Sequence, residues 1–162
     1  MTLVTTTKDL DALTMVVVAE FDAGIEQVWQ LWADPRKLER WWGPPEWPAT
    51  FTRHHLVPGG ESRYHMTGPD GEQPGGYWQI SDVEEPTRLV VRDGFTDEAG
   101  NPAPGDPVTM EVTLDAQPGG TRMTLTSTFA SAEQLDEMVK MGMEEGLAGA
   151  IEQIDGVLAE AA

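Results

Sequence analysis

Hydrophobic and polar side chains alternate along several short stretches of this chain, and a period of two is typical of a β-strand with one buried face. Residues 14–21 show the pattern first, although valines also make their second face partly apolar. The clearest case is a hairpin of residues 108–115 and 122–129, joined by the turn sequence Pro118-Gly119-Gly120. Further turn clusters, at residues 58–60, 69–71, 75–76 and 85–86, separate other strand-like runs. The pattern predicts an antiparallel sheet.

Two short helices are predicted directly after the first of these strands. Asp34-Pro35 offers a helix N-cap followed by proline at the first helical position, and Gly43-Pro44-Pro45 is a strong stop signal. We expect the large tryptophan side chains of this segment to be buried where the helices meet the sheet. The apolar stripes are Ile25, Val28, Trp29 and Trp32 on the first helix and Leu38, Trp41 and Trp42 on the second.

A single long helix is predicted at the end of the chain. It begins at the capping-box sequence Ser131-x-x-Gln134 and has helical periodicity as far as about Leu158. Three glycines lie beside its apolar face, and each costs about 1 kcal/mol relative to alanine inside a helix. They indicate either close packing or a bend, or else space left for a ligand. These glycines are Gly142, Gly146 and Gly149.

Together these elements predict an α+β fold in which a curved antiparallel sheet surrounds the C-terminal helix. Residues 1–12 are polar and threonine-rich and are expected to form a flexible lead, with one domain over residues 13–160. Residues 94–107 contain three prolines and many polar residues, so we expect a long irregular loop there.

Composition and charge exclude several classes of function. The net charge is −18, from 28 acidic and 10 basic residues, which argues against binding to nucleic acid or to anionic membranes. The chain has no cysteine, which excludes disulfides, thiolate catalysis and cysteine-ligated zinc. No apolar run is long enough to span a membrane, and no apolar signal segment is visible, so a cytoplasmic location is predicted.

The candidate catalytic residues are few, and no metal or cofactor site is expected. His54 and His55 are adjacent in a predicted strand, so their side chains point to opposite faces and cannot bind one metal ion together. His65 lies one strand later, without a metal-binding or triad spacing. Glu145 borders the glycine stripe and is a candidate acid–base group if it points inward, or a solvated rim residue if it does not. The nucleophile elbow, the phosphate-binding loop and the dinucleotide fingerprint are all missing.

The remaining inward-facing material is apolar, aromatic and rich in methionine, which adapts to irregular shapes. A sheet that surrounds a helix with glycines along one side tends to leave a concave apolar pocket. The alternative for any single residue is ordinary core filling. The predicted lining residues are Tyr64, Met66, Trp78, Met110, Phe129, Met138, Gly142 and Glu145.

The pattern W-x-D-P-x-x-L-x-x-W-W-G-P over residues 32–44 resembles the family named after the activator of the heat-shock-protein-90 ATPase, a branch of the START-like superfamily. The resemblance continues through residues 58–60, 64–71 and 84–89, and spans roughly residues 15–158. Near the end the family usually has Gly-Trp, where this chain has Gly146-Leu147. The resemblance implies the helix-grip fold and places a ligand pocket between the sheet and the last helix.

We therefore expect a protein, monomeric or homodimeric, that binds a small hydrophobic or aromatic molecule without a cofactor. One alternative is a cyclase- or hydratase-like enzyme that uses Tyr64, His65 or Glu145 as acid–base groups, as in other START-like proteins. A single polar group with a shifted pKa inside an otherwise apolar pocket would favour this alternative. A second alternative, suggested by the family name, is a module that interacts with a chaperone.

Overall fold

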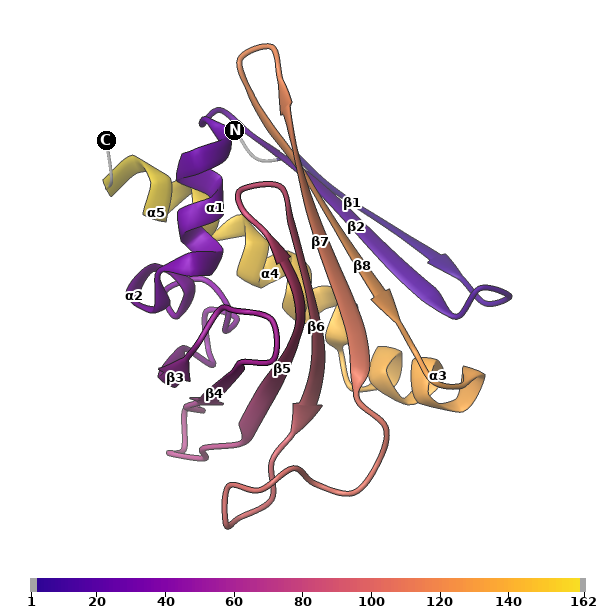
Figure 1. The fold of residues 1–162 in the computed structure, drawn as a ribbon. Coiled ribbons are helices and arrows are strands. Elements are labelled where there is room, and N and C mark those ends of the chain that lie inside the picture. Colours follow the sequence, from indigo (N-terminus) through magenta and orange to yellow (C-terminus); the bar gives the residue numbers. More distant parts are fainter. Residues whose placement is uncertain (1–2, 161–162) are drawn as a thin grey trace.

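The computed structural model describes residues 3–160, in which eight strands are interspersed with five helices. Figure 1 shows their arrangement along the chain. The strands are β1 (Leu3–Asp9), β2 (Thr14–Phe21), β3 (Ala49–His54), β4 (Glu61–Met66), β5 (Gly75–Glu84), β6 (Arg88–Phe95), β7 (Val108–Gln117) and β8 (Gly120–Thr128). The helices are α1 (Ile25–Ala33), α2 (Pro35–Leu38), α3 (Ala132–Lys140), α4 (Met143–Glu152) and α5 (Ile154–Glu160).

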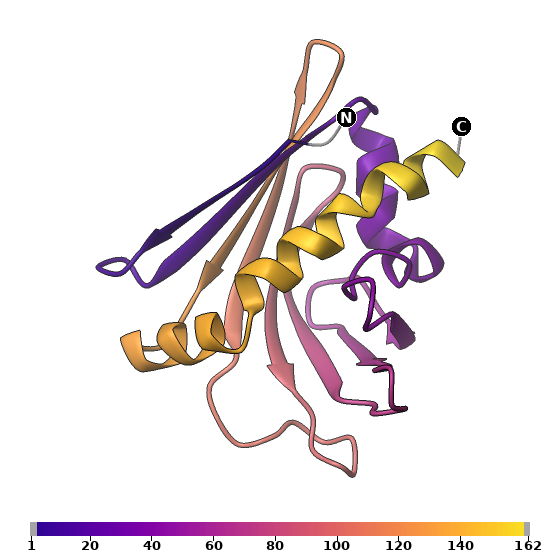
Figure 2. The same ribbon diagram turned by 180° about the vertical axis from the view of Figure 1, so that it is seen from behind.

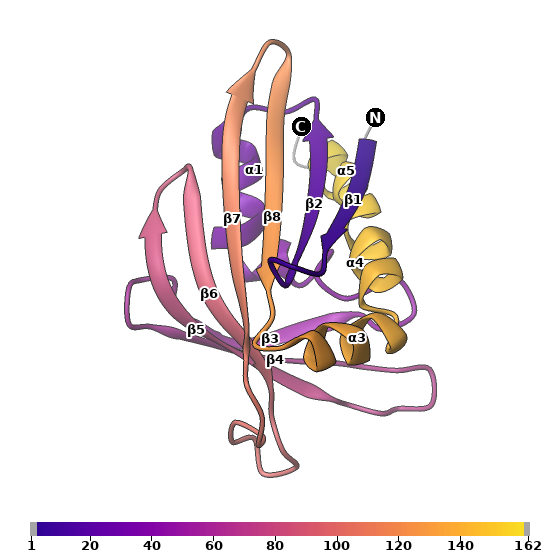
Figure 3. The same cartoon turned by 90° about the vertical axis from the view of Figure 1, so that its right-hand side faces the viewer.

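All eight strands form one antiparallel sheet in the order β1-β2-β8-β7-β6-β5-β4-β3. The sheet is strongly curved, and α4 and α5 cross its concave side (Figures 2 and 3). This is the α+β helix-grip fold that the sequence predicted. The predicted hairpin is confirmed as β7 and β8, whose inward positions alternate with outward ones in the burial pattern of both strands.

The N-terminal strand corrects one expectation. Residues 1–12 were expected to be a flexible lead, but Leu3–Asp9 forms the edge strand β1, with Thr5 opposite Val18 and Asp9 opposite Thr14. The threonines in this strand favour extended backbone without giving an apolar alternation, so no strand signal appears in the sequence. Residues 1 and 2 lie outside the described residues, and the extent of the domain stays a prediction.

The tryptophan-rich segment forms the main core, as predicted. Trp29, Trp32 and Trp41 are each at most 2% exposed, and the Trp32 and Trp41 rings meet edge to face with their centroids 4.8 Å apart. The Asp34 side chain caps α2 by accepting a hydrogen bond from the backbone N–H of Arg36 at 2.9 Å. The predicted second helix was too long, because α2 ends at Leu38, before Trp41 and Trp42.

The C-terminal segment corrects the expectation of one long helix. Gly142 has a φ of +86°, a left-handed conformation that ends α3 and precedes α4, and a further break at Gln153 separates α4 from α5. Of the two interpretations of the glycines, the bend applies to Gly142. Gly146 and Gly149 face Pro44 and Pro45, where an added Cβ would lie at an ordinary contact distance of 3.7 Å from each proline ring.

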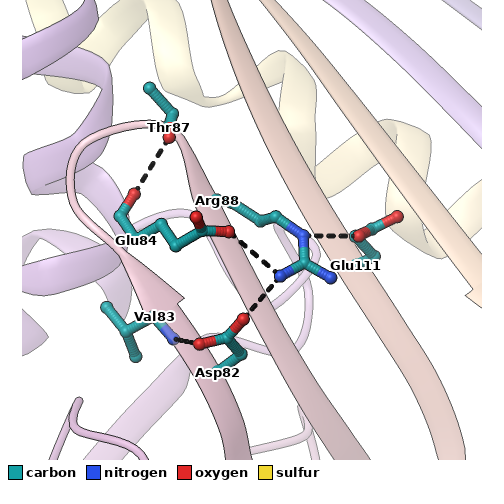
Figure 4. A network of polar contacts seen from close by, with 6 residues as sticks. All are labelled: Asp82, Val83, Glu84, Thr87, Arg88 and Glu111. Carbon is teal, nitrogen blue, oxygen red and sulfur yellow. Dashed lines mark hydrogen bonds and ion pairs between the residues drawn. The ribbon is translucent and has the colours of Figure 1, made fainter.

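A polar network joins β5, β6 and β7 (Figure 4). The Arg88 guanidinium pairs with Asp82 at 2.6 Å, with Glu84 at 3.1 Å and with Glu111 at 2.7 Å. Three partly exposed carboxylates thus surround one cation. Arg88 therefore offsets local repulsion in a strongly acidic protein.

Candidate functional site

A pocket with a volume of about 300 Å³ lies between the sheet and the helices α3 and α4. Most of its lining is apolar, and five methionines contribute to it. Phe95 and Met141 line it while being 51% and 70% exposed, so they mark its opening to solvent. The lining residues are Trp42, Pro44, Tyr64, Met66, Asp93, Gly94, Phe95, Val108, Met110, Ser127, Met138, Met141, Gly142, Met143, Gly146 and Leu147.

Five of the eight predicted lining residues meet at this pocket, namely Tyr64, Met66, Met110, Met138 and Gly142. The other three do not line it. Trp78 is fully buried and does not reach the surface of the pocket. Phe129 belongs to a second core cluster with Met15, Val108 and Leu135. Glu145 is exposed on α4 and lies outside the lining, which corresponds to the solvated-rim alternative.

A tyrosine and an aspartate supply the polar part of the pocket wall. The Tyr64 hydroxyl on β4 donates a hydrogen bond to Oδ1 of Asp93 on β6 at 3.0 Å. The Tyr64 ring crosses the intervening strand β5 at Gly76, its partner in the register. A Cβ at residue 76 would lie only 2.3 Å from Cζ of Tyr64. Only glycine therefore leaves room for Tyr64 to reach Asp93.

The pKa values of both groups are shifted, chiefly by burial. Burial raises the pKa of Asp93 to about 7, although hydrogen-bonding interactions with Tyr64 and Trp78 act in the opposite direction. Burial raises the pKa of Tyr64 well above 10, and the nearby negative charge of Asp93 raises it further. At neutral pH Tyr64 therefore keeps its proton, while Asp93 can exchange one.

Asp93 was not identified from the sequence, although a signal exists. Leu89 and Val91 of β6 are buried, and a period of two from them points the side chain of Asp93 to the same inner face. Because the irregular loop is expected to begin at residue 94, Asp93 stands at the boundary of the predicted strand. An acidic residue at an inward position of a strand is the pattern that would have identified it.

Two indole N–H groups complete the surroundings of the pair. Trp42 Nε1 and Trp78 Nε1 are buried and make no hydrogen bond of good geometry among the described residues. The Trp42 N–H is nevertheless close enough to lower the pKa of Tyr64, and the Trp78 N–H lowers that of Asp93. The rings of Trp42 and Trp78 are perpendicular, with centroids 5.1 Å apart. Aromatic rings thus flank the polar pair.

The histidines lie away from this pair. His54 Nε2 donates to the backbone carbonyl of Trp32 at 2.7 Å, so Nδ1 accepts from the Ser62 hydroxyl at 2.8 Å. Burial lowers the pKa of His54, which keeps this ring neutral and structural. His55 is exposed, and His65 points to the outer side of β4, where it lines a separate polar groove with Arg53 and Arg63.

Two simple patterns, a cluster of metal-binding side chains and a membrane-spanning helix, are not found in residues 3–160. No group of three or more histidine, aspartate or glutamate side chains in this range could hold a metal ion. None of the helices in the same range is long and apolar enough to cross a membrane.

The curved sheet, the C-terminal helices and the position of the pocket define a START-like helix-grip protein. Residues 22–159 match the family model described as activator of Hsp90 ATPase homolog 1-like protein, and the chain belongs to this family. No curated protein matches the chain.

Solved structures agree with this assignment. Protein Ms6760 from Mycobacterium smegmatis is 48% identical, with a TM-score of 0.89 over 96% of this chain and 97% of that one. A protein from Arthrobacter aurescens is 51% identical, with a TM-score of 0.92 over 96% of this chain and 91% of that one. The AHSA1 protein from Silicibacter pomeroyi is only 20% identical and shows the fold alone, with a TM-score of 0.75 over 92% of this chain and 99% of that one.

Proposed function

We propose that the protein binds a small molecule with a hydrophobic or aromatic body in the pocket between the sheet and the C-terminal helices. The observation that carries this proposal is the pairing of an apolar, methionine-rich wall with one polar pair, Tyr64 and Asp93. Apolar pockets with a few convergent polar groups are typical ligand sites, because the wall supplies affinity and the polar groups fix orientation. Methionine side chains allow the wall to adapt to the shape of the ligand.

The proposal can be tested by filling the pocket. Leu147 lines it from α4, and Leu147→Trp would replace an aliphatic side chain by a larger aromatic one at the position where the family usually has tryptophan. We expect this variant to bind the neutral dye N-phenyl-1-naphthylamine at least tenfold more weakly than the unmodified protein does, as measured by the fluorescence of the dye. Glu152→Trp is the matched control, because this exposed residue of the same helix lies outside the pocket lining. Unchanged dye binding by Leu147→Trp, or no binding by the unmodified protein, would contradict the proposal.

A second candidate function is acid–base catalysis, which the raised pKa of Asp93 favours. A carboxyl group with a pKa of about 7 can both accept and donate a proton near neutral pH. The hydrogen bond from Tyr64 would hold that carboxyl in position. Native mass spectrometry of protein purified from its own host would identify a co-purifying molecule. Conversion of that molecule by the unmodified protein but not by Asp93→Asn would support catalysis, and binding without conversion by either would oppose it.

Contact with a chaperone stays a separate proposal, which rests on the description of the family. A pull-down from the host that recovers an ATPase chaperone in stoichiometric amount would support it. A pull-down that recovers none would oppose it.

A further inference from the structure

The carboxyl group of Asp93 lines an apolar pocket without a positively charged partner. None of the ion pairs found within residues 3–160 includes Asp93. Strand β4 presents one titratable group to it, Tyr64, and the adjacent strands place Trp78 and Val108 opposite it in the register. The helices contribute apolar side chains and glycines to the pocket wall. The neighbouring acidic residues of α4 do not line the pocket: Glu144 pairs with Lys8, and Glu145 is exposed.

The pair offers hydrogen-bond acceptors to a ligand when Asp93 is ionised. Tyr64 uses its one hydroxyl proton in the hydrogen bond to Asp93 Oδ1, so this hydroxyl cannot donate to a ligand. A carboxylate accepts several hydrogen bonds and donates none, so one from Tyr64 leaves acceptor capacity unused. A ligand group that pairs with the Asp93 carboxylate must therefore bring a donor.

The aromatic rings beside the pair suit a cation. Trp42 and Tyr64 both line the pocket, and their ring centroids lie 6.2 Å apart. Aromatic rings attract ammonium groups, most strongly where water is excluded. The net charge of −18 also attracts cations to the protein and repels anionic ligands such as fatty acids.

We propose that the ligand is a hydrophobic amine whose protonated nitrogen pairs with Asp93 and donates to its carboxylate, while its apolar body lies among the methionines. This inference rests on the proposed function and adds the charge and the polar group of the ligand. The ammonium group would also give Asp93 the positively charged partner that it lacks, because a carboxylate that is partly removed from water is costly unless it is paired.

Three naphthalene probes of one size test the inference: 1-naphthylmethylamine, 1-naphthalenemethanol and 1-naphthoic acid, each titrated by calorimetry at pH 8. We expect the amine to bind at least tenfold more tightly than the alcohol, and the acid to bind most weakly. Because Asp93 has a pKa of about 7, the preference for the amine should shrink at pH 5.5, where Asp93 is protonated.

Asp93→Asn separates a local ion pair from the general attraction of an acidic protein. We expect this variant to bind the alcohol as the unmodified protein does and to lose the preference for the amine. If all three probes bind equally, the amine is the wrong ligand class. If Asp93→Asn keeps the preference for the amine, Asp93 is not its partner. Either result would overturn the inference and leave the proposed function standing. Tighter binding of the alcohol at pH 5.5 than at pH 8 would instead indicate a neutral ligand that accepts a hydrogen bond from protonated Asp93, and would overturn the inference. If none of the probes and no neutral dye binds, the proposed function itself fails.

Discussion

The indole Nε1 of Trp41 donates a hydrogen bond to the backbone carbonyl of Leu31 at 2.9 Å. Leu31 lies in the last turn of α1, where carbonyl groups have no partner within the helix. His54 acts in the same way on the carbonyl of Trp32. The C-terminal end of α1 is thus closed by two side chains that come from later in the chain. This arrangement links the first helix to the turn after α2 and to β3.

Replacement of Trp41 should therefore be among the most damaging changes to stability. Trp41→Ala removes a fully buried ring and a buried donor, and we expect it to lower the free energy of unfolding by about 3–5 kcal/mol. Trp41→Phe should cost less, because it retains much of the apolar volume and loses mainly the hydrogen bond. Urea denaturation of the three proteins measures both losses. A loss below about 1 kcal/mol for Trp41→Ala, the scale of a surface substitution, would contradict the core position of this ring.

The second prediction concerns the pH dependence caused by Asp93. Its pKa is about 7 in the folded protein, above the usual value of about 3.9, so the native state retains a proton that the unfolded chain releases. Stability from this residue is therefore present at low pH and is lost as the pH rises from about 4 to about 7. We expect Asp93→Asn to be more stable than the unmodified protein at pH 8, by on the order of 2–4 kcal/mol.

The same difference should nearly vanish below about pH 4, where both side chains are neutral. Urea denaturation of the two proteins between pH 4 and pH 8 measures it, and subtraction cancels most of the effect of the other carboxylates. Parallel stability curves over this range would show that Asp93 titrates normally.

Two glycine substitutions should have opposite effects. Gly142 has a positive φ, so Gly142→Ala forces alanine into a left-handed conformation and should destabilise the protein by about 1 kcal/mol. Gly156 lies inside α5, and an added Cβ there would meet no other atom within 4 Å, so Gly156→Ala should stabilise the protein by about 0.5–1 kcal/mol. Thermal unfolding of both variants measures the two signs. A gain for Gly142→Ala would mean that α3 and α4 form one continuous helix.

The Arg88 network gives a prediction that depends on salt. Arg88→Gln leaves the carboxylates of Asp82, Glu84 and Glu111 without their shared cation, so we expect a lower Tm, most clearly at low salt. Lys140→Gln is the matched control, because it removes the same charge but leaves a single carboxylate, Asp136. Calorimetry at low and high salt should show a larger loss for Arg88→Gln that shrinks as salt increases. Equal losses of Tm in both variants would mean that Arg88 stabilises the protein only through its effect on net charge.

The fold could be predicted where burial imposes a period on the sequence. Strands β7 and β8 have one buried face, and α1 has an apolar stripe, so their periods of two and 3.6 are visible in the residues. Strand β1 has no such signal, because its threonines tolerate both an edge strand and a loop. The break at Gly142 was missed for a different reason: glycine reduces helix propensity, but the sign of its φ is set by tertiary packing.

The candidate site was predictable only in part. Met66, Met110 and Met138 could be assigned to an apolar interior from composition and period. The role of Asp93 can be recognised only when two facts are known: that β6 extends past this residue, and that Tyr64, two strands away in the sheet, donates a hydrogen bond to it. The role of Gly76 could not be predicted for the same reason. Residues 75–76 were expected to form a turn, but they begin β5, where Gly76 makes room for the Tyr64 ring.

The left-handed backbone conformation of Gly142 also divides the C-terminal segment into two units, α3 and the helices after it, which can unfold locally and separately. Leu135 of α3 packs in a small cluster with Met15, Val108 and Phe129, whereas Ala150, Ile151 and Ile154 belong to the main core. Local openings follow such divisions, and each unit exchanges its amide hydrogens with its own free energy. We therefore expect the amides of α3 to exchange with solvent much faster than those of α4. Because Met138 is both part of α3 and part of the pocket wall, such an opening would admit a ligand while the sheet and α4 stay folded.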